Sequence, residues 1–169
     1  MTNGSVNHTE ADAGVPPEKI GGWLYFPAIG LIVGCITRTI YVSIVAFLIP
    51  FFVHDAYRAN AHKLLEILLA YVASEALLLA FLAYTTVRFF RKKRNAPNAA
   101  TAMLIAQVVV YGLLIALFIA ADADYTITRN VPGLAKGSLI AFAGSVLAAA
   151  LWIPYFRISK RVKKTFVLD

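Results

Sequence analysis

Four long runs of apolar residues constrain this chain more than any other feature of its sequence. They extend from Trp23 to Val53, from Leu64 to Val87, from Ala100 to Ala121 and from Leu134 to Phe156. Each run has at least the roughly 20 residues with which an α-helix crosses about 30 Å of hydrocarbon. With 60% hydrophobic and 15% charged residues, the chain is also more apolar than average soluble domains. The sequence therefore predicts an all-α fold, an integral membrane bundle of four transmembrane helices.

The predicted domain organisation is a short tail followed by one membrane domain. Residues 1–20 are polar, include Pro16 and Pro17, and lack the ordered parts of a secretory signal, so we expect a disordered cytoplasmic tail. Residues 21–169 form the predicted transmembrane domain. Its spans are expected at about 23–45, 64–87, 100–121 and 134–156.

The first apolar run is longer than one span requires. As a helix, residues 23–53 would measure about 46 Å at a rise of 1.5 Å per residue, against roughly 30 Å of hydrocarbon. Two outcomes are open at this stage. Either the helix projects from the bilayer beyond about Ser43, with an apolar continuation to Val53, or it breaks between Gly34 and Arg38, where a glycine and a charge coincide.

Basic residues crowd into the segments that follow the second and the fourth run. They are Arg91, Lys92, Lys93 and Arg94 in the first segment, and Lys160, Arg161, Lys163 and Lys164 in the second. Cytoplasmic loops of membrane proteins carry an excess of lysine and arginine, so both segments are predicted to be cytoplasmic. Four spans then place both termini inside the cell. These residues could also dock anionic lipid head groups, although fixing the topology is enough to explain them, and the net charge of +7 does not indicate a nucleic-acid partner.

Four polar side chains inside the apolar runs mark the candidate intramembrane site, namely Arg38, Glu66, Glu75 and Gln107. Arg38 lies about 22 Å from Trp23 along a helix, and Glu75 about 16 Å from the outer start of the second span, so their depths are similar. A charge at mid-bilayer costs about 2.5–3.5 kcal/mol on insertion scales, and pairing Arg38 with Glu75 or Glu66 would lower that cost. Such a pair either locks the first span to the second or belongs to a polar cavity for an ion or a small polar solute.

Small residues recur on the fourth run at helical spacing. They are Gly137, Ala141, Gly144, Ser145 and Ala148. Small side chains let two helix backbones approach closely, so this face is predicted to pack against another helix.

Metal binding and catalysis find little support. His54, Asp55, His62 and Glu66 stand near the start of the second run, where imidazole and carboxylate groups could share an ion. Their spacing matches no established zinc motif, and a hydrated ring at the membrane surface is the commoner arrangement, so we expect no metal and no cofactor. No nucleophile with a neighbouring base and no phosphate-binding loop is present, which predicts a protein that is not an enzyme.

Two segments at the ends of the predicted membrane domain carry a family resemblance. The first runs from Ile20 to Leu31 and reads IGGWL, then PAIGL after two intervening residues, followed by Arg38; the second runs from Trp152 to Val167 and reads WIPYF, then SKRVKKTFV. Together they resemble the bacterial membrane family called domain of unknown function 2569, with the middle of the chain matching mainly in hydropathy and in an acid near Glu75. The resemblance implies a small protein with four helices in a Gram-negative inner membrane, and it implies no established activity.

The sequence favours a non-enzymatic accessory, assembly or scaffold protein that acts through lateral helix contacts in the bilayer. Its partner would be another membrane protein or a second copy of the chain. The alternative is an oligomeric transporter or channel for an ion or a small polar solute, with Arg38, Glu75 and Gln107 at its polar site.

Overall fold

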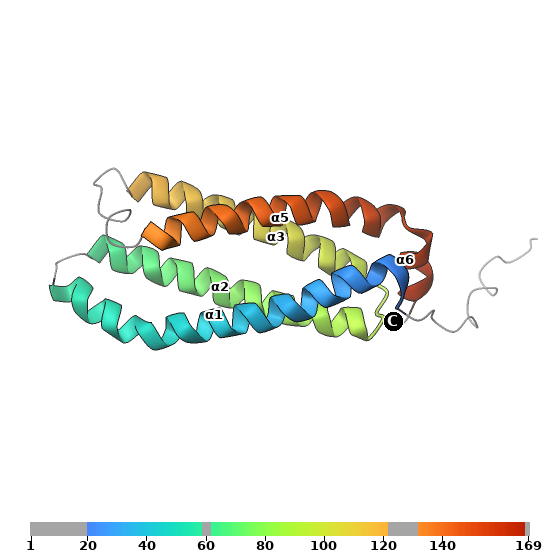
Figure 1. Cartoon of the computed structure of the whole chain (residues 1–169), viewed down its shortest axis with the longest axis horizontal. Helices are drawn as coiled ribbons and strands as arrows, with labels where there is room; N and C mark the ends of the chain where they lie inside the picture. The colour runs from blue at the N-terminus through green and yellow to red at the C-terminus, as the bar shows by residue number, and fades with distance from the viewer. Residues whose placement is uncertain (1–19, 59–61, 122–131, 168–169) are drawn as a thin grey trace, which may run out of the picture.

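The computed structural model describes residues 20–58, 62–121 and 132–167, and its elements there are all helices. A short 3-10 turn, η1 (Gly22–Leu24), leads into α1 (Tyr25–Arg58), followed by α2 (His62–Phe90), α3 (Ala96–Ala121), α5 (Pro132–Ile158) and the short α6 (Lys160–Thr165). The four long helices lie side by side as a bundle (Figure 1). Each is long and apolar enough to cross a membrane, so the predicted all-α, four-span architecture is confirmed over these residues. The tail predicted over residues 1–20 lies outside the described residues, apart from Ile20.

The first helix is continuous where a break was one of the two expectations. Helix α1 passes through Gly34 and Arg38 without interruption and contains 34 residues, or about 51 Å at the usual rise. Its apolar window ends at Leu48, so Pro50 and the residues after it lie beyond the part that is suited to hydrocarbon. The helix is therefore longer than a bilayer core is thick, as the projecting alternative requires.

The helices pack in chain order but do not close into a complete ring. Among the described residues, α1 packs on α2, α2 on α3 and α3 on α5, whereas α1 and α5 have no comparable packing. We call the opening between these two helices the α1–α5 seam. The hydroxyl of Thr86 lies 3.4 Å from the Cys35 sulfur and helps to hold α1 on α2 along this open bundle.

One end of the bundle is sealed by an apolar cluster, which we call the end cluster. Its buried members are Leu24, Ala28, Phe89, Ala96, Ala100, Phe156, Val162 and Phe166. They come from η1, α1, α2, α3, α5, α6 and the residue after α6, and the rings of Phe89 and Phe166 lie 4.9 Å apart. The segments that carry the family resemblance, IGGWL near the start and SKRVKKTFV near the end, are thus brought together in space.

Glycine is required at the entrance to this cluster. Gly22 has a φ of +59°, which side chains other than glycine rarely adopt, and a Cβ there would lie 2.7 Å from Nη1 of Arg161. Ser159 caps the following helix by accepting a hydrogen bond from the backbone N–H of Val162 at 3.4 Å, which fixes α6 across the end of the bundle.

The two basic segments meet at this same end. The link between α2 and α3 and the short α6 lie together beside the start of α1 (Figure 1). Lys92 and Lys93 are half-buried, and the other predicted basic residues, Arg91, Arg94, Lys160, Arg161, Lys163 and Lys164, are exposed. We call this the basic end of the bundle.

Candidate functional site

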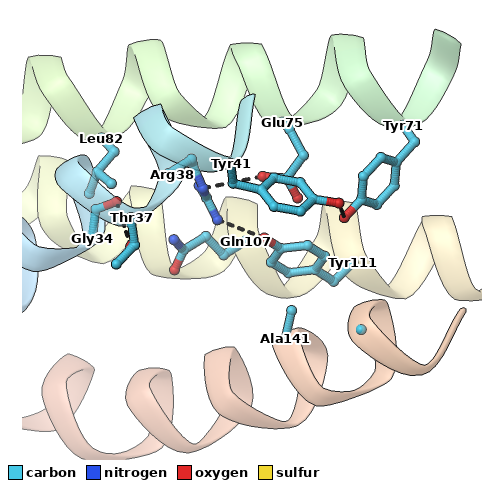
Figure 2. A pocket seen from close by; sticks show the side chains of 11 residues that line it. Gly34, Thr37, Arg38, Tyr41, Tyr71, Glu75, Leu82, Gln107, Tyr111 and Ala141 are labelled. Carbon is cyan, nitrogen blue, oxygen red and sulfur yellow. Dashed lines mark hydrogen bonds and ion pairs between the residues drawn. The ribbon is translucent and has the colours of Figure 1, made fainter. Parts of the chain in front are cut away.

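A cavity of about 460 Å³ lies on the α1–α5 seam. All four long helices contribute to it, and we call it the polar cavity (Figure 2). Its lining consists of Gly34, Thr37, Arg38 and Tyr41 from α1, Tyr71, Glu75 and Leu82 from α2, Gln107 and Tyr111 from α3, and Gly137 and Ala141 from α5.

Arg38 and Glu75 form an ion pair in this cavity. Nε of Arg38 lies 3.2 Å from Oε2 of Glu75, and the two side chains are only 11% and 5% exposed. Of the two acids considered as partners, Glu75 therefore contacts Arg38, whereas Glu66 is exposed. Each charge lies in a medium of low polarity, where an unpaired charge is costly. The attraction between the two groups lowers the free-energy cost of placing both at this depth.

A third helix joins the pair through a tyrosine. Nη2 of Arg38 donates a hydrogen bond of 2.7 Å to the hydroxyl of Tyr111, so the guanidinium lies between α2 and α3 (Figure 2). The guanidinium carbon also lies 5.9 Å from the centre of the Tyr111 ring, at the outer limit of a cation–π contact. Arg38 thereby connects three helices that pack in a row.

Sequence reasoning missed the tyrosines of this site. The hydroxyls of Tyr41 and Tyr71 lie 2.9 Å apart and extend the polar lining beyond the ion pair. Tyrosine is counted among the hydrophobic residues of the composition, so these residues did not stand out as polar groups. A signal was nevertheless present, because Tyr41 follows Arg38 by three residues and Tyr71 precedes Glu75 by four, which places each on the same helix face as its charge.

One donor of the guanidinium is unsatisfied. Nη1 of Arg38 is buried and has no hydrogen-bond partner among the described residues. A buried donor without an acceptor costs about 1–3 kcal/mol, and more when it is charged. Lipid chains cannot supply the acceptor, so the polar cavity is suited to an occupant that carries one.

Gln107 stands where the polar cavity meets a second, apolar cavity of about 200 Å³. Gly34 and Leu82 line both cavities as well. The second cavity continues along the same seam toward Trp152 and Phe156, near the end cluster. The seam is therefore polar at Arg38 and apolar toward the basic end.

The small residues of α5 do not share one environment. Ala141 lines the polar cavity, Ala148 lines the apolar one, and Ser145 is buried, its hydroxyl donating to the backbone carbonyl of Phe142 at 2.8 Å. Gly137 and Gly144 are exposed, and a Cβ at either would have no atom within 4 Å. The predicted packing face is thus only partly covered within one chain.

The residues considered for a metal are not gathered into a site over the described part of the chain. His54 and Glu66 are exposed, and the side chains of Asp55 and His62 lie outside the described residues. Within the ranges 20–58, 62–121 and 132–167, no three histidine, cysteine, aspartate or glutamate residues are placed to hold a metal ion.

Comparison with known proteins identifies a family and a similar protein. Residues 17–167 match the family model described as protein of unknown function (DUF2569). The chain is also 27% identical over 154 residues to inner membrane protein YdgK of Escherichia coli strain K12, covering 89% of this chain and 95% of that relative. No solved structure matches it. The range of the family match includes every residue that lines the polar cavity.

Proposed function

This chain belongs to the DUF2569 family of proteins of unknown function, as its opening and closing motifs predicted, and from that premise we propose that it binds a small uncharged solute in the polar cavity. The protein is a multi-pass inner-membrane protein, and the proposed role is that of a small transporter rather than an enzyme. The observation that carries the proposal is the buried Nη1 of Arg38, a donor without a partner among the described residues.

The charge balance of the cavity favours an uncharged occupant. Arg38 and Glu75 already neutralise each other at 3.2 Å, so a charged solute would add an uncompensated charge at low polarity. A neutral molecule with a carbonyl, hydroxyl or ether oxygen would instead accept the free hydrogen bond of Arg38. Gln107 and the phenol groups of the lining offer further donors and acceptors to the same molecule.

The size of the cavity favours a small molecule. Its volume of about 460 Å³ falls within the range of roughly 300–1,000 Å³ that is usual for small-molecule sites.

The end cluster supports a transport role because it closes the bundle at the basic end. Leu24, Phe89 and Phe166 are among the buried apolar residues that lie between the cavities and the basic end. A solute in the polar cavity would reach the basic end only after these side chains move, which is the behaviour of a gate. We expect the end cluster to separate in a second conformation.

Thermal unfolding of the purified protein in uncharged detergent tests the binding step. Glycerol, urea and a short-chain benzoquinone serve as uncharged probes with oxygen acceptors, and acetate and ammonium serve as charged probes of small size. All are used at millimolar concentration, far below the molar range in which glycerol and urea change the stability of proteins in general. We expect at least one uncharged probe to raise the Tm and neither ion to do so. Stabilisation by the ions alone, or by none of the five probes, would contradict the proposal.

Two matched variants make this test specific to the cavity. Gln107→Leu removes a lining amide and leaves the ion pair intact, so the rise in Tm and the flux of the same solute into proteoliposomes are expected to fall together. Ser74→Ala removes a hydroxyl that donates only to the carbonyls of Ala70 and Tyr71, and it is expected to keep both.

A second candidate function is the accessory role, in which α5 binds a helix of another membrane protein or of a second copy. Gly144 supports it, because the residue is exposed with nothing within 4 Å of a built Cβ, so another backbone can approach closely. In a Cys35→Ser background, Gly144→Cys is expected to crosslink to that helix in native membranes, and Leu113→Cys on the exposed face of α3 is not. Equal crosslinking at both positions would indicate random collision.

The orientation is also a proposal, and it follows from the gathering of both basic segments at one end. The positive-inside rule places that end in the cytoplasm, with both termini on that side. Reporters fused after Asp169 and inserted beside Asp124 are expected to label from opposite sides of the membrane. Labelling from the same side would overturn the scheme of four crossings.

A further inference from the structure

A third cavity, of about 490 Å³, lies at the basic end and does not involve the ion pair of the polar cavity. The start of α3, the end of α5 and the segment around α6 enclose it, and we call it the basic pocket. Its lining residues are Arg94, Pro97, Asn98, Thr101, Phe156, Arg157, Val162, Lys163 and Phe166.

Three cations surround this pocket, and none of its lining residues is acidic. Arg94, Arg157 and Lys163 come from three separate segments, the α2–α3 link, the end of α5 and α6, and all three are exposed. Their convergence on one cavity distinguishes them from Arg91, Lys160 and Lys164, which are equally basic and exposed at the same end but do not line it. The pocket therefore concentrates positive charge that no acid among its lining residues in the described part of the chain compensates.

The floor of the basic pocket is apolar. Phe156, Val162 and Phe166 line it and are buried members of the end cluster, so the cations lie beside a hydrophobic base. Helix α3 begins beside them, and its N-terminus adds a partial positive charge, while Asn98 and Thr101 in its first two turns add polar side chains. A ligand that fits here is anionic at one end and apolar at the other.

We infer that the basic pocket binds the phosphate head group of an anionic phospholipid from the surrounding leaflet. Arginine pairs with phosphate through two parallel hydrogen bonds, and Lys163 adds a mobile positive charge. The neighbouring aromatic side chains of Trp152 and Tyr155, 5.7 Å apart, are of the type found at the level of lipid head groups. A soluble phosphate ion shares the anionic chemistry, but it would leave the apolar floor unused.

The experiment compares two triple variants that remove equal charge from the same end of the bundle. Arg94→Gln with Arg157→Gln and Lys163→Gln changes the pocket, whereas Arg91→Gln with Lys160→Gln and Lys164→Gln leaves it intact. Binding of a fluorescent phosphatidylglycerol is measured by energy transfer in nanodiscs of phosphatidylcholine. We expect the pocket variant to lose at least about tenfold more affinity than the control, because each hydrogen bond to a charged group contributes a factor of about ten or more.

Each outcome decides the inference. Equal losses in the two variants would mean that only the overall positive surface attracts lipid, and they would overturn the site. Displacement of the labelled lipid by millimolar inorganic phosphate would overturn the lipid source in favour of a free anion. Should the triple variant fail to fold, Arg157→Gln is compared with Arg91→Gln, and the smaller loss must again belong to Arg91. The two cavities share no lining residue, so binding of uncharged solutes in the polar cavity is expected to be unchanged by these variants, and this inference and the proposed function fail independently.

Discussion

Arg38 in the polar cavity and Arg157 in the basic pocket show how depth changes the requirements of the same side chain. Arg38 is almost buried and is held by an acid at 3.2 Å and a tyrosine at 2.7 Å. Arg157 is exposed in a pocket whose described lining residues include no acid. Deep in the bilayer the protein must supply the compensating groups itself, whereas at the membrane surface water and lipid head groups can supply them. The comparison teaches that an arginine at depth is a packing element, while one at the surface is available to a ligand.

The largest effect that would test this comparison is expected from breaking the ion pair. Glu75→Ala leaves a buried guanidinium that keeps its charge, so we expect a loss of about 3–5 kcal/mol in the free energy of unfolding. Arg38→Ala should also destabilise the protein, because it leaves the buried carboxyl of Glu75 without its partner. The double variant should recover part of the loss. Unfolding in detergent measures all three, and strictly additive losses would contradict the pairing.

Removal of single hydroxyls sharpens the same contrast inside the cavity. Tyr111→Phe deletes an acceptor of the charged Arg38, and we expect a loss of about 1.5–3 kcal/mol. Tyr41→Phe deletes only a bond between two neutral phenols and should cost about 0.5–1.5 kcal/mol. Thermal unfolding of the two variants under the same condition shows which of them loses more stability. If Tyr41→Phe were the more damaging, the charged bond would not be the stronger one.

A substitution at a glycine with positive φ tests the packing at the basic end. Gly22→Ala places a Cβ 2.7 Å from Nη1 of Arg161 at a φ of +59°, and we expect it to cost about 1–2 kcal/mol. Gly30→Ala is the control, because nothing lies within 4 Å of its Cβ and alanine favours a helix. Equal Tm values for the two variants would show that the left-handed turn at Gly22 is not required.

Salt is expected to have the smallest effect on stability and to separate the two arginine sites most simply. Raising the ionic strength from about 0.1 M to about 1 M shortens the Debye length from about 10 Å to about 3 Å. Lipid binding at the exposed basic pocket should weaken, whereas the loss caused by Glu75→Ala should change little. Affinity for phosphatidylglycerol and Tm, measured at both concentrations, test this, and a salt-sensitive Glu75→Ala loss would place the pair in contact with water.

Hydropathy was sufficient to predict the spans, because crossing a bilayer depends on the length and composition of a segment, and both can be read directly from the sequence. Depth along a helix was equally readable, and it brought Arg38 and Glu75 to the same level before any packing was known. The rotation of each helix about its own axis, which decides the face it turns toward its neighbours, could not be predicted from the sequence. Tyr111 on α3 was therefore missed as a partner of Arg38. The open seam was also invisible, because the sequence does not state which helices fail to meet.

The small residues of α5 show a different limit of prediction from the sequence. Small residues are frequent on this helix, so a three- and four-residue spacing could be drawn through Gly144 although that residue lies on the exposed surface. Only the position of a neighbouring helix separates a packed small residue from an unpacked one. The same holds for Arg94, Arg157 and Lys163, whose convergence depends on α6 folding back across the bundle.

The end cluster joins Leu24, in the turn before α1, to Phe166, which follows α6. Until α6 and Phe166 have been translated, the beginning of α1 therefore lacks part of its neighbours and has α2 as its main support. Insertion of the chain can proceed helix by helix, but closure at this end has to wait for α6 and Phe166. A chain whose translation stopped shortly before Val162 could have its four long helices inserted in the bilayer. It would lack Val162 and Phe166, and the end cluster would be incomplete.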